Sequence, residues 1–251
     1  MTSVGDEGRL YREFAWLYDA IARPRPSELR FYEGLAQRAG GPVLEPACGS
    51  GRLLAPLRQS GFEVWGCDAE PAMVALALGQ LASEPGPPYH VAVQSLAALE
   101  QPVRAGLLLL PLDALRLAPD DATLLSILAR CHHHLRAGGT LAADLYLPAD
   151  RRDQHGQAGP YAAPDGGTAQ VSTRWRVDGE WDVEETHIVS RDGHGRPAMA
   201  RSLERYRRIA LPRLLDVLAQ AGFEPPQLWS SFDQRTWHSR SDWVALAARR
   251  A

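Results

Sequence analysis

The chain has 251 residues, of which 45% are hydrophobic and 23% charged, a composition typical of a globular protein with a sizeable core. A formal net charge of -3 excludes the strong positive field with which nonspecific nucleic-acid-binding proteins hold phosphates. The longest apolar run, Leu107–Leu110, is too short to span a bilayer, and nothing at the N-terminus resembles a signal peptide, so we expect a cytoplasmic protein. The 3 cysteines lack metal-ligand spacing, which favours reduced thiols and no metal site.

The first part of the chain has helical spacing, with Leu10, Phe14, Leu17 and Ile21 on one face and a break at 24–26. Segments typical of strands and helices then alternate. The expected strands are 42–45, 63–67, 90–94, 105–110 and 140–146, and the expected helices are 53–60, 71–81 and 123–135, the last closed by Gly138 and Gly139. Repeated strand–helix units of this length predict a parallel sheet with helices on both faces.

The pattern changes after Pro148. Residues 149–170 are rich in Gly, Pro, Asp and Gln, which predicts a loop or lid. Three runs with period two follow, at 171–177, 181–190 and 200–210, separated by Asp-Gly pairs that are typical of tight turns. They predict an antiparallel excursion from the main sheet. A helix at 212–221 and strands near 227–232 and 243–248 complete the expected elements.

Three parts are therefore expected. They are an N-terminal helical lid over 1–40, an α/β domain over 41–148 and 211–251, and an antiparallel β cap over 149–210.

A glycine-containing loop, Ala47–Gly51, joins an expected strand ending at Glu45 to an expected helix. Gly49 and Gly51 let the backbone approach a ligand, and the N–H groups at the helix start can bind a carboxylate. Asp68 ends the next strand, where a carboxylate can accept hydrogen bonds from both hydroxyls of a ribose. A dinucleotide loop requires a third glycine where this chain has leucine, so a nicotinamide-dependent reductase is the less favoured interpretation.

The segment 43–51 resembles motif I of class I S-adenosylmethionine-dependent methyltransferases, and 62–73 resembles their second motif. Residues 132–139 resemble the end of the family's hydrophobic helix and its Leu-x-x-Gly-Gly turn into the fifth strand. The resemblance implies a Rossmann-like α/β fold with a seven-stranded sheet, mostly parallel with the last strand antiparallel, and an antiparallel excursion after the fifth strand. It also implies S-adenosylmethionine as the cofactor.

The resemblance further implies contacts along the cofactor. Glu45 lies near its ammonium group, the loop backbone near its methionine part, Asp68 at the ribose, and Ala69 and Met73 beside the adenine. The expected cofactor-binding set is Glu45, Ala47, Gly49, Gly51, Asp68, Ala69, Met73, Gln94, Ser95 and Leu110.

The chain departs from the family pattern at two points. Ala47 replaces the first glycine of the loop, which suggests a negative φ there. Gln94 and Ser95 replace an acidic residue after the third strand and can still hydrogen-bond the adenine amino group.

Several acceptor classes lack their motifs. The segment Leu110–Asp113 contains neither the Asn/Asp-Pro-Pro-Tyr of base-amino methyltransferases nor the cysteine of cytosine-C5 enzymes. The chain has no lysine and no asparagine, which excludes a Lys-Asp-Lys-Glu ribose methyltransferase and disfavours metal-dependent catechol-type enzymes. We therefore expect methyl transfer to N or O of a small molecule, with no nucleic-acid or membrane partner, by a monomer or homodimer. The alternative is a non-catalytic S-adenosylmethionine-binding protein that acts as a partner or sensor.

The catalytic residue stays unassigned, because a base is required only if the acceptor must lose a proton. The resemblance implies that Tyr18 (or Tyr11) lies over the cofactor, although it could simply pack its helix. Asp113 could orient an amine or hydroxyl, or begin a turn. His187 shares a strand face with Glu185 and is a base candidate, although a solvated histidine is the alternative.

Three further groups favour ordinary structural roles. The run His132–His134 ends a helix, where charge complementarity is favoured over metal binding. A set of arginines indicates a solvated strand face rather than a grip on an anionic acceptor: Arg201, Arg205, Arg207 and Arg208. A set of tryptophans indicates core or interface positions: Trp175, Trp181, Trp229 and Trp237.

Overall fold

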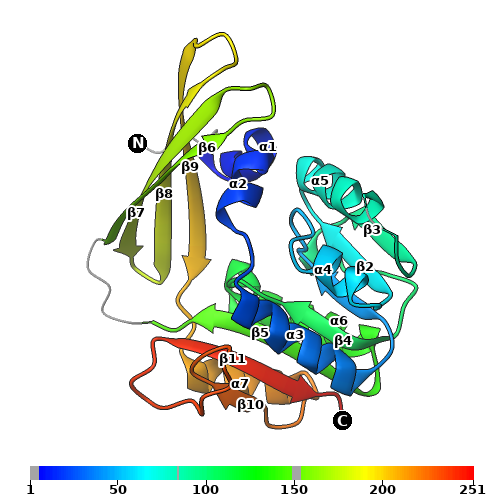
Figure 1. Ribbon diagram of the computed structural model, residues 1–251. Helices are drawn as coiled ribbons and strands as arrows, with labels where there is room; N and C mark the ends of the chain where they lie inside the picture. Colours follow the sequence, from blue (N-terminus) through cyan, green and yellow to red (C-terminus); the bar gives the residue numbers. More distant parts are fainter. Residues whose placement is uncertain (1–5, 84, 149–153) are drawn as a thin grey trace. The chain divides into compact units, whose positions relative to one another are not determined.

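The computed structural model describes residues 6–83, 85–148 and 154–251 (Figure 1). The chain forms two compact units. The larger unit comprises residues 24–149 and 209–251, and the smaller comprises residues 1–23 and 150–208. Over the described residues, no helix combines the length and the apolar character that a membrane crossing requires.

The larger unit contains a seven-stranded sheet in the order β10-β11-β5-β4-β1-β2-β3. All neighbouring strands are parallel except β11, which is antiparallel to β5 and to β10. The strands are β1 Val43–Pro46, β2 Val64–Asp68, β3 Tyr89–Val93, β4 Ala105–Leu110, β5 Leu135–Tyr146, β10 Gln227–Trp229 and β11 Trp243–Arg249. The expected sheet, mostly parallel with an antiparallel last strand, is confirmed.

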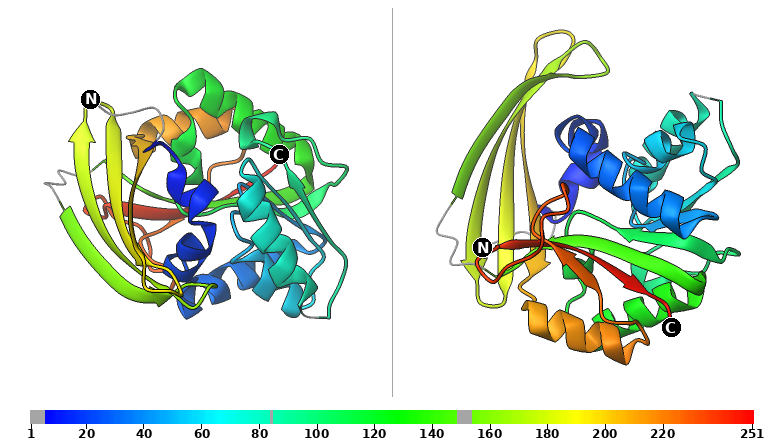
Figure 2. Two further views of the ribbon diagram at one scale, coloured as in Figure 1. Left: turned by 90° about the horizontal axis from the view of Figure 1, so that it is seen from above. Right: turned by 60° about the horizontal axis from the view of Figure 1, so that its bottom comes forward.

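Helices cover both faces of this sheet (Figure 2). One face carries α3 Pro26–Ala39, α4 Leu54–Gln59 and α5 Pro71–Ala82; the other carries α6 Asp121–His134 and α7 Leu211–Gln220. Two 3-10 helices, η2 Leu96–Ala98 and η3 Ala114–Leu117, follow β3 and β4. Along β4, Leu107 and Leu109 pack toward α3 and α4, whereas Leu108 and Leu110 pack toward α6 and α7. Burial on both faces explains why the central strands are continuous apolar runs.

The fifth strand begins earlier than the sequence indicated. We expected the preceding helix to run to 135 and close at Gly138 and Gly139, but α6 ends at His134 and β5 starts at Leu135. Leu135 pairs with Ala105 of β4, and the carbonyl of Gly139 accepts the N–H of Arg250. The register with β4 shifts between Ala105 and Leu107, so the strand has an irregular start, in which Gly138 has a φ of 69°.

The strand order reverses at β1, which lies between β2 and β4. In an open parallel sheet, the connections that follow the two strands at such a point run to opposite faces of the sheet. A crevice therefore forms between them, beyond the carboxyl ends of the strands. The carboxyl ends of β1, β2 and β4 and the loops that follow them meet at that edge, and together they contain most of the expected site residues.

The smaller unit is an antiparallel sheet in the order β6-β7-β8-β9, which confirms the antiparallel excursion after the fifth strand. Its elements are α1 Arg9–Glu13, α2 Ala15–Ile21, β6 Gln154–Ala162, β7 Thr168–Asp178, β8 Trp181–Arg191 and β9 Pro197–Arg207. The expectation of a loop over 149–170 is wrong for 154–162, because this Gly- and Gln-rich segment pairs along β7. Residues 149–153 lie outside the described residues.

The N-terminal segment divides between the two units. Leu10 and Leu17 pack against Ala169, Val171 and Ile188 of the antiparallel sheet. The helix α3 instead packs against β4 and β5 of the larger unit. The boundary therefore falls after residue 23 rather than at residue 40, where the sequence placed it.

Candidate functional site

The loop after β1 has left-handed backbone at every second residue. The φ angles are 59° at Ala47, 55° at Gly49 and 80° at Gly51. The expectation of a negative φ at Ala47 is wrong. Alternation of φ sign points successive N–H groups toward a common side, an arrangement that binds anionic groups. The N–H of Cys48 is held by the carbonyl of Cys67, which fixes the loop to the end of β2 at 2.9 Å.

Replacing Ala47 by glycine is expected to stabilise the protein. An L-residue in the left-handed region costs about 1–2 kcal/mol, while glycine loses about 0.5–1 kcal/mol more backbone entropy on folding. The balance predicts a gain of about 0.5–1 kcal/mol in the free energy of unfolding, measured by urea denaturation. Ala69→Gly is the matched control, since Ala69 is exposed and has no positive φ, and should destabilise slightly. A lower free energy of unfolding in Ala47→Gly than in wild type would contradict backbone strain at Ala47.

Gly51 makes a close contact with α5 as well as a left-handed turn. A Cβ atom added at this position would lie 3.1 Å from the Cβ and 3.2 Å from the Cα of Ala77. The loop therefore rests directly on the backbone of α5.

Asp68 joins the ends of β1 and β2. One carboxylate oxygen accepts the N–H of Gly49 at 2.8 Å, and the other accepts the N–H of Glu70 at 2.9 Å. Burial raises the pKa of Asp68, although these backbone hydrogen bonds oppose the shift. Each carboxylate oxygen has a second lone pair, so the side chain retains capacity for a ligand. Asp68 thus positions the loop in addition to any ribose contact.

The structure gives Gln94 and Ser95 local roles. The amide of Gln94 accepts the N–H of Glu100 at 3.0 Å and donates to the carbonyl of Glu100 at 3.2 Å. The hydroxyl of Ser95 accepts the N–H of Ala97 and caps η2. The backbone N–H of Gln94 also donates to the carbonyl of Asp68. Both residues therefore lie beside Asp68 but shape their own turn. Of the two expected adenine contacts, Ala69 is exposed and Met73 is buried in α5.

Glu45 is a buried carboxylate with an unused oxygen. Its side chain is 1% exposed, and its Oε2 has no hydrogen-bond partner among the described residues. Burial, with the nearby negative charges of Glu28 and Asp68, raises the pKa of Glu45 to about 8 against the pull of Arg52. Arg52 is itself paired with Glu28 at 2.6 Å, both side chains being buried. Buried polar atoms are normally satisfied, so this oxygen indicates a place for a donor.

The loop after β4 contains two strained residues, because φ is 48° at Leu112 and 63° at Asp113. Asp144 at the end of β5 holds both: its carboxylate accepts the N–H of Leu112 at 3.2 Å and its carbonyl accepts the N–H of Asp113 at 3.1 Å. The carboxylate of Asp113 accepts the N–H of Tyr146 and a hydrogen bond from Arg116 at 3.0 Å. Such strain persists only where the surroundings impose it, and it is common at active sites.

Two residues of this region were not identified from the sequence. The Tyr32 hydroxyl of α3 donates to Asp144 at 2.5 Å, and both side chains are buried. Burial raises the pKa of Asp144 to about 7, against the hydrogen bond from Tyr32. A lone carboxylate in the apolar fifth strand was a usable signal for Asp144. No sequence pattern indicated Tyr32, because its hydrogen-bond partner is remote in sequence.

The stability of the protein is expected to fall with rising pH through Asp144. Its pKa of about 7 exceeds the unfolded value, so the native state binds the extra proton. The stabilisation is present at pH 4 and is lost as pH rises through 7, by at most about 1.4 kcal/mol per pH unit. The free energy of unfolding is measured by urea denaturation at several pH values from 4 to 8. Asp144→Asn should remove the part of its pH dependence that is due to Asp144, whereas Asp216→Asn at an exposed site should not. If the free energy of unfolding depended on pH in the same way in wild type and Asp144→Asn, the raised pKa of Asp144 would be contradicted.

The remaining catalytic candidates belong to the smaller unit. Tyr11 packs edge-on against Tyr18 at 5.0 Å, and its hydroxyl lies 3.2 Å from that of Tyr206. The side chain of His187 is 53% exposed and bonds Glu185 at 2.8 Å, and Glu185 also pairs with Arg201 at 2.7 Å. Glu185 and His187 are thus part of an ion cluster at the protein surface.

The groups assigned structural roles lie as follows. His134 bonds the carbonyl of Arg130 at its Nδ1 and accepts the N–H of Gln101 at its Nε2. Over the described residues, no group of three or more potential metal ligands occurs. Arg208 pairs with Asp182 at 2.6 Å, and Arg205 lies over the ring of Trp181. Phe31 packs against Trp229, and Trp175 stacks on Tyr206.

Comparison with known proteins agrees with this geometry. Residues 43–139 match the family model of a methyltransferase domain. A search of curated protein sequences found no match.

Solved structures match nearly the whole chain. An S-adenosylmethionine-dependent methyltransferase from Clostridium acetobutylicum ATCC 824 has a TM-score of 0.77 at 15% identity, covering 94% of this chain and 97% of that chain. A sugar N-methyltransferase from Streptoalloteichus sp ATCC 53650 has a TM-score of 0.75 at 20% identity, covering 94% and 92%. An amino pentose methyltransferase from Micromonospora echinaspora, solved with S-adenosylmethionine bound, has a TM-score of 0.72 at 18% identity, covering 95% and 96%.

The loop between β1 and α4 and the carboxylates Glu45 and Asp68 lie within the matched residues 43–139. The domain match identifies residues 43–139 as a methyltransferase domain, and the whole chain shares the fold of solved S-adenosylmethionine-dependent methyltransferases.

Proposed function

We propose that the protein is an S-adenosylmethionine-dependent enzyme that methylates a nitrogen or oxygen atom of a small-molecule acceptor. The observation that carries this proposal is the antiparallel unit β6–β9, inserted directly after β5. Matched structures whose coverage exceeds nine-tenths of both chains include a sugar N-methyltransferase and an amino pentose methyltransferase. Coverage of that extent includes the inserted unit as well as the cofactor domain. We propose that this unit, with α1 and α2, covers the acceptor as cap and lid.

The geometry of the larger unit supports the following proposed cofactor contacts. Glu45 supplies an unused buried oxygen for the cofactor's ammonium group. The left-handed loop from Ala47 to Gly51 supplies backbone N–H groups for its carboxylate. Asp68 receives the ribose hydroxyls on its remaining lone pairs. Ala69, Met73, Gln94 and Ser95 border the adenine, and Leu110 borders the methyl group.

When bound, S-adenosylmethionine would supply an electrophilic methyl group for an acceptor nitrogen or oxygen atom. The chain orients the acceptor and excludes water, which together provide much of the rate in such a displacement. The strained Leu112 and Asp113 present the rim of the site, with Asp144 holding them in place. Tyr18, Asp113 and His187 are the candidates for removing a proton from the acceptor.

We also propose a cytoplasmic location and a small-molecule partner for the enzyme, which acts as a monomer or homodimer. The cysteines Cys48, Cys67 and Cys131 are free and buried, as a reducing compartment allows.

An acceptor panel tests the proposal. Amino sugars, hydroxylated metabolites and short peptides are incubated with the enzyme and S-adenosylmethionine, and S-adenosylhomocysteine is measured by mass spectrometry. Product with at least one small amine or alcohol is expected. Cofactor binding without turnover over the whole panel would instead favour a non-catalytic S-adenosylmethionine-binding protein.

Asp68→Asn tests the proposed ribose contact. The amide keeps the size of the side chain but loses one acceptor and the charge. Affinity for S-adenosylhomocysteine, measured by calorimetry, is expected to fall about 10- to 100-fold, as for the loss of charged hydrogen bonds. Asp216→Asn, at an exposed site on α7, is the control. Unchanged affinity in Asp68→Asn would remove the ribose contact from the proposal.

A further inference from the structure

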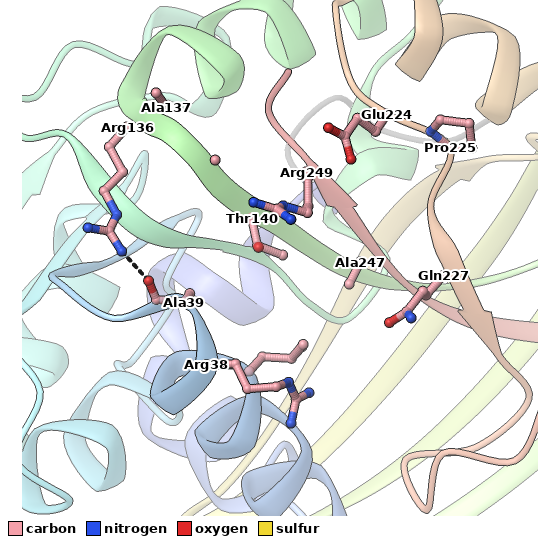
Figure 3. A pocket seen from close by; sticks show the side chains of 12 residues that line it. Arg38, Ala39, Arg136, Ala137, Thr140, Glu224, Pro225, Gln227, Ala247 and Arg249 are labelled. Carbon is pink, nitrogen blue, oxygen red and sulfur yellow. Dashed lines mark hydrogen bonds between the residues drawn. The ribbon is translucent and has the colours of Figure 1, made fainter.

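A pocket is lined by residues of the larger unit that lie away from the loop after β1. Figure 3 shows the side chains that line it. It has a volume of about 710 Å³ and is lined by the end of α3, the start of β5, and residues of β10 and β11. The cofactor residues lie at the carboxyl ends of β1 and β2, whereas this pocket lies at the amino end of the parallel strand β5. A volume of this size is in the range that accommodates a metabolite.

The lining of this pocket is strongly basic. Arg38, Arg136 and Arg249 are on its wall, against a single carboxylate from Glu224. Arg136 donates to the carbonyl of Ala39, which fixes its guanidinium at the rim (Figure 3). Elsewhere in the described chain many arginines are paired with carboxylates, as Arg52 is with Glu28. Neither Arg38 nor Arg249 has an ion pair with any described residue.

The scaffold holds Arg249 in position and leaves space beside it. Arg249 pairs with Thr140 in the sheet, and its carbonyl accepts the N–H of Glu224 at 2.9 Å. Gly138 has a φ of 69°, and a Cβ atom there would lie 3.1 Å from the terminal nitrogen of Arg249. The guanidinium therefore lies over bare backbone, where a larger residue would displace it.

We propose that this pocket binds a small phosphorylated metabolite at a site separate from methyl transfer. A guanidinium pairs with phosphate through two parallel hydrogen bonds, and a dianion matches two guanidiniums that lack carboxylate partners. Arg38 and Arg249 lie at separate places on the wall, where each offers a guanidinium to a phosphoryl group, and Thr140 and Gln227 offer neutral hydrogen-bonding groups (Figure 3). The organic part of the ligand lies over the apolar side chains of the floor, which include Leu35 and Ala247.

Pyrophosphate and fructose 1,6-bisphosphate are the test probes, titrated calorimetrically into the full chain at physiological ionic strength. Saturable binding is expected at submillimolar concentration, with a dissociation constant of about 0.1–1 mM. The double variant Arg38→Gln/Arg249→Gln should weaken binding at least about 10-fold, the loss expected for charged hydrogen bonds. Its affinity for S-adenosylhomocysteine should stay unchanged, which also shows that it folds.

The matched control is Arg235→Gln/Arg240→Gln, which removes the same charge from two exposed positions outside the pocket. It should bind both probes as wild type does. The proposal is overturned if neither probe binds saturably, if both double variants weaken binding equally, or if S-adenosylhomocysteine competes with the probes. Citrate is titrated in the same way as a carboxylate ligand. If citrate bound with the same affinity as the phosphate probes, the proposed preference for phosphate over carboxylate would be overturned.

Discussion

Replacing Gly51 by alanine is expected to lower the free energy of unfolding by about 2–5 kcal/mol and to abolish measurable cofactor binding. The φ of 80° at Gly51 costs an alanine about 1–2 kcal/mol. The new Cβ would also lie 3.1 and 3.2 Å from atoms of Ala77, so either α5 or the loop must shift. Overpacking of this kind costs about 1–3 kcal/mol. Since the same loop binds the cofactor, its displacement removes the site.

Gly79→Ala is the matched control for this experiment. Gly79 lies in α5, is exposed, has no positive φ, and a Cβ there would meet nothing within 4 Å. Alanine is favoured over glycine in a helix by about 1 kcal/mol, so this variant should be more stable than wild type. Urea denaturation and calorimetry with S-adenosylhomocysteine measure both variants. A Gly51→Ala protein with wild-type stability and affinity would show that the contact with α5 does not constrain the loop.

Glu45→Gln is expected to affect stability and cofactor affinity in opposite directions. The ligand-free protein buries a carboxylate whose Oε2 has no described partner, and ionising it above pH 8 is unfavourable. Glutamine removes that cost, so stability at pH 9 should rise. The cofactor's ammonium loses a charged partner, and its affinity should fall about 10- to 100-fold. Loss of both stability and affinity would indicate that Glu45 acts mainly as a structural residue.

Cofactor binding should also release a proton from Glu45. Its pKa of about 8 in the ligand-free protein means that the carboxyl is mostly protonated at pH 7. An ammonium group beside it favours the ionised form, so the pKa falls on binding. Calorimetry at pH 7 in two buffers of different ionisation enthalpy should therefore give different binding enthalpies. Glu45→Gln should abolish this difference, and a buffer-independent enthalpy in wild type would contradict the protonation of Glu45.

The cofactor domain was predictable because its signals are local. Strands buried on both faces are apolar runs, as β4 is, and the loops that follow parallel strands meet at one edge. The sequence positions of Glu45 and Asp68 therefore indicated that they meet. The left-handed φ at Ala47 was not predictable, because the surrounding loop imposes a conformation that alanine disfavours.

Other features depend on partners that are remote in sequence. The strand β6 has the composition of a loop, and it is extended because β7 pairs with it. The bond between Tyr32 and Asp144 joins α3 to β5, and no local pattern indicates it. The assignment of α1 to the antiparallel unit depends on Gly8, whose N–H donates to the carbonyl of Leu203.

The two units are interleaved along the chain. The helices α1 and α2 precede the larger unit in sequence but pack on a sheet whose last strand, β9, ends at Arg207. The larger sheet is likewise incomplete without β11, which lies between β5 and β10 although both of these strands precede it in sequence. The core of each unit therefore depends on contacts of high sequence separation, which form slowly. Removing the last strand would leave β5 with an open edge, and such an edge favours aggregation.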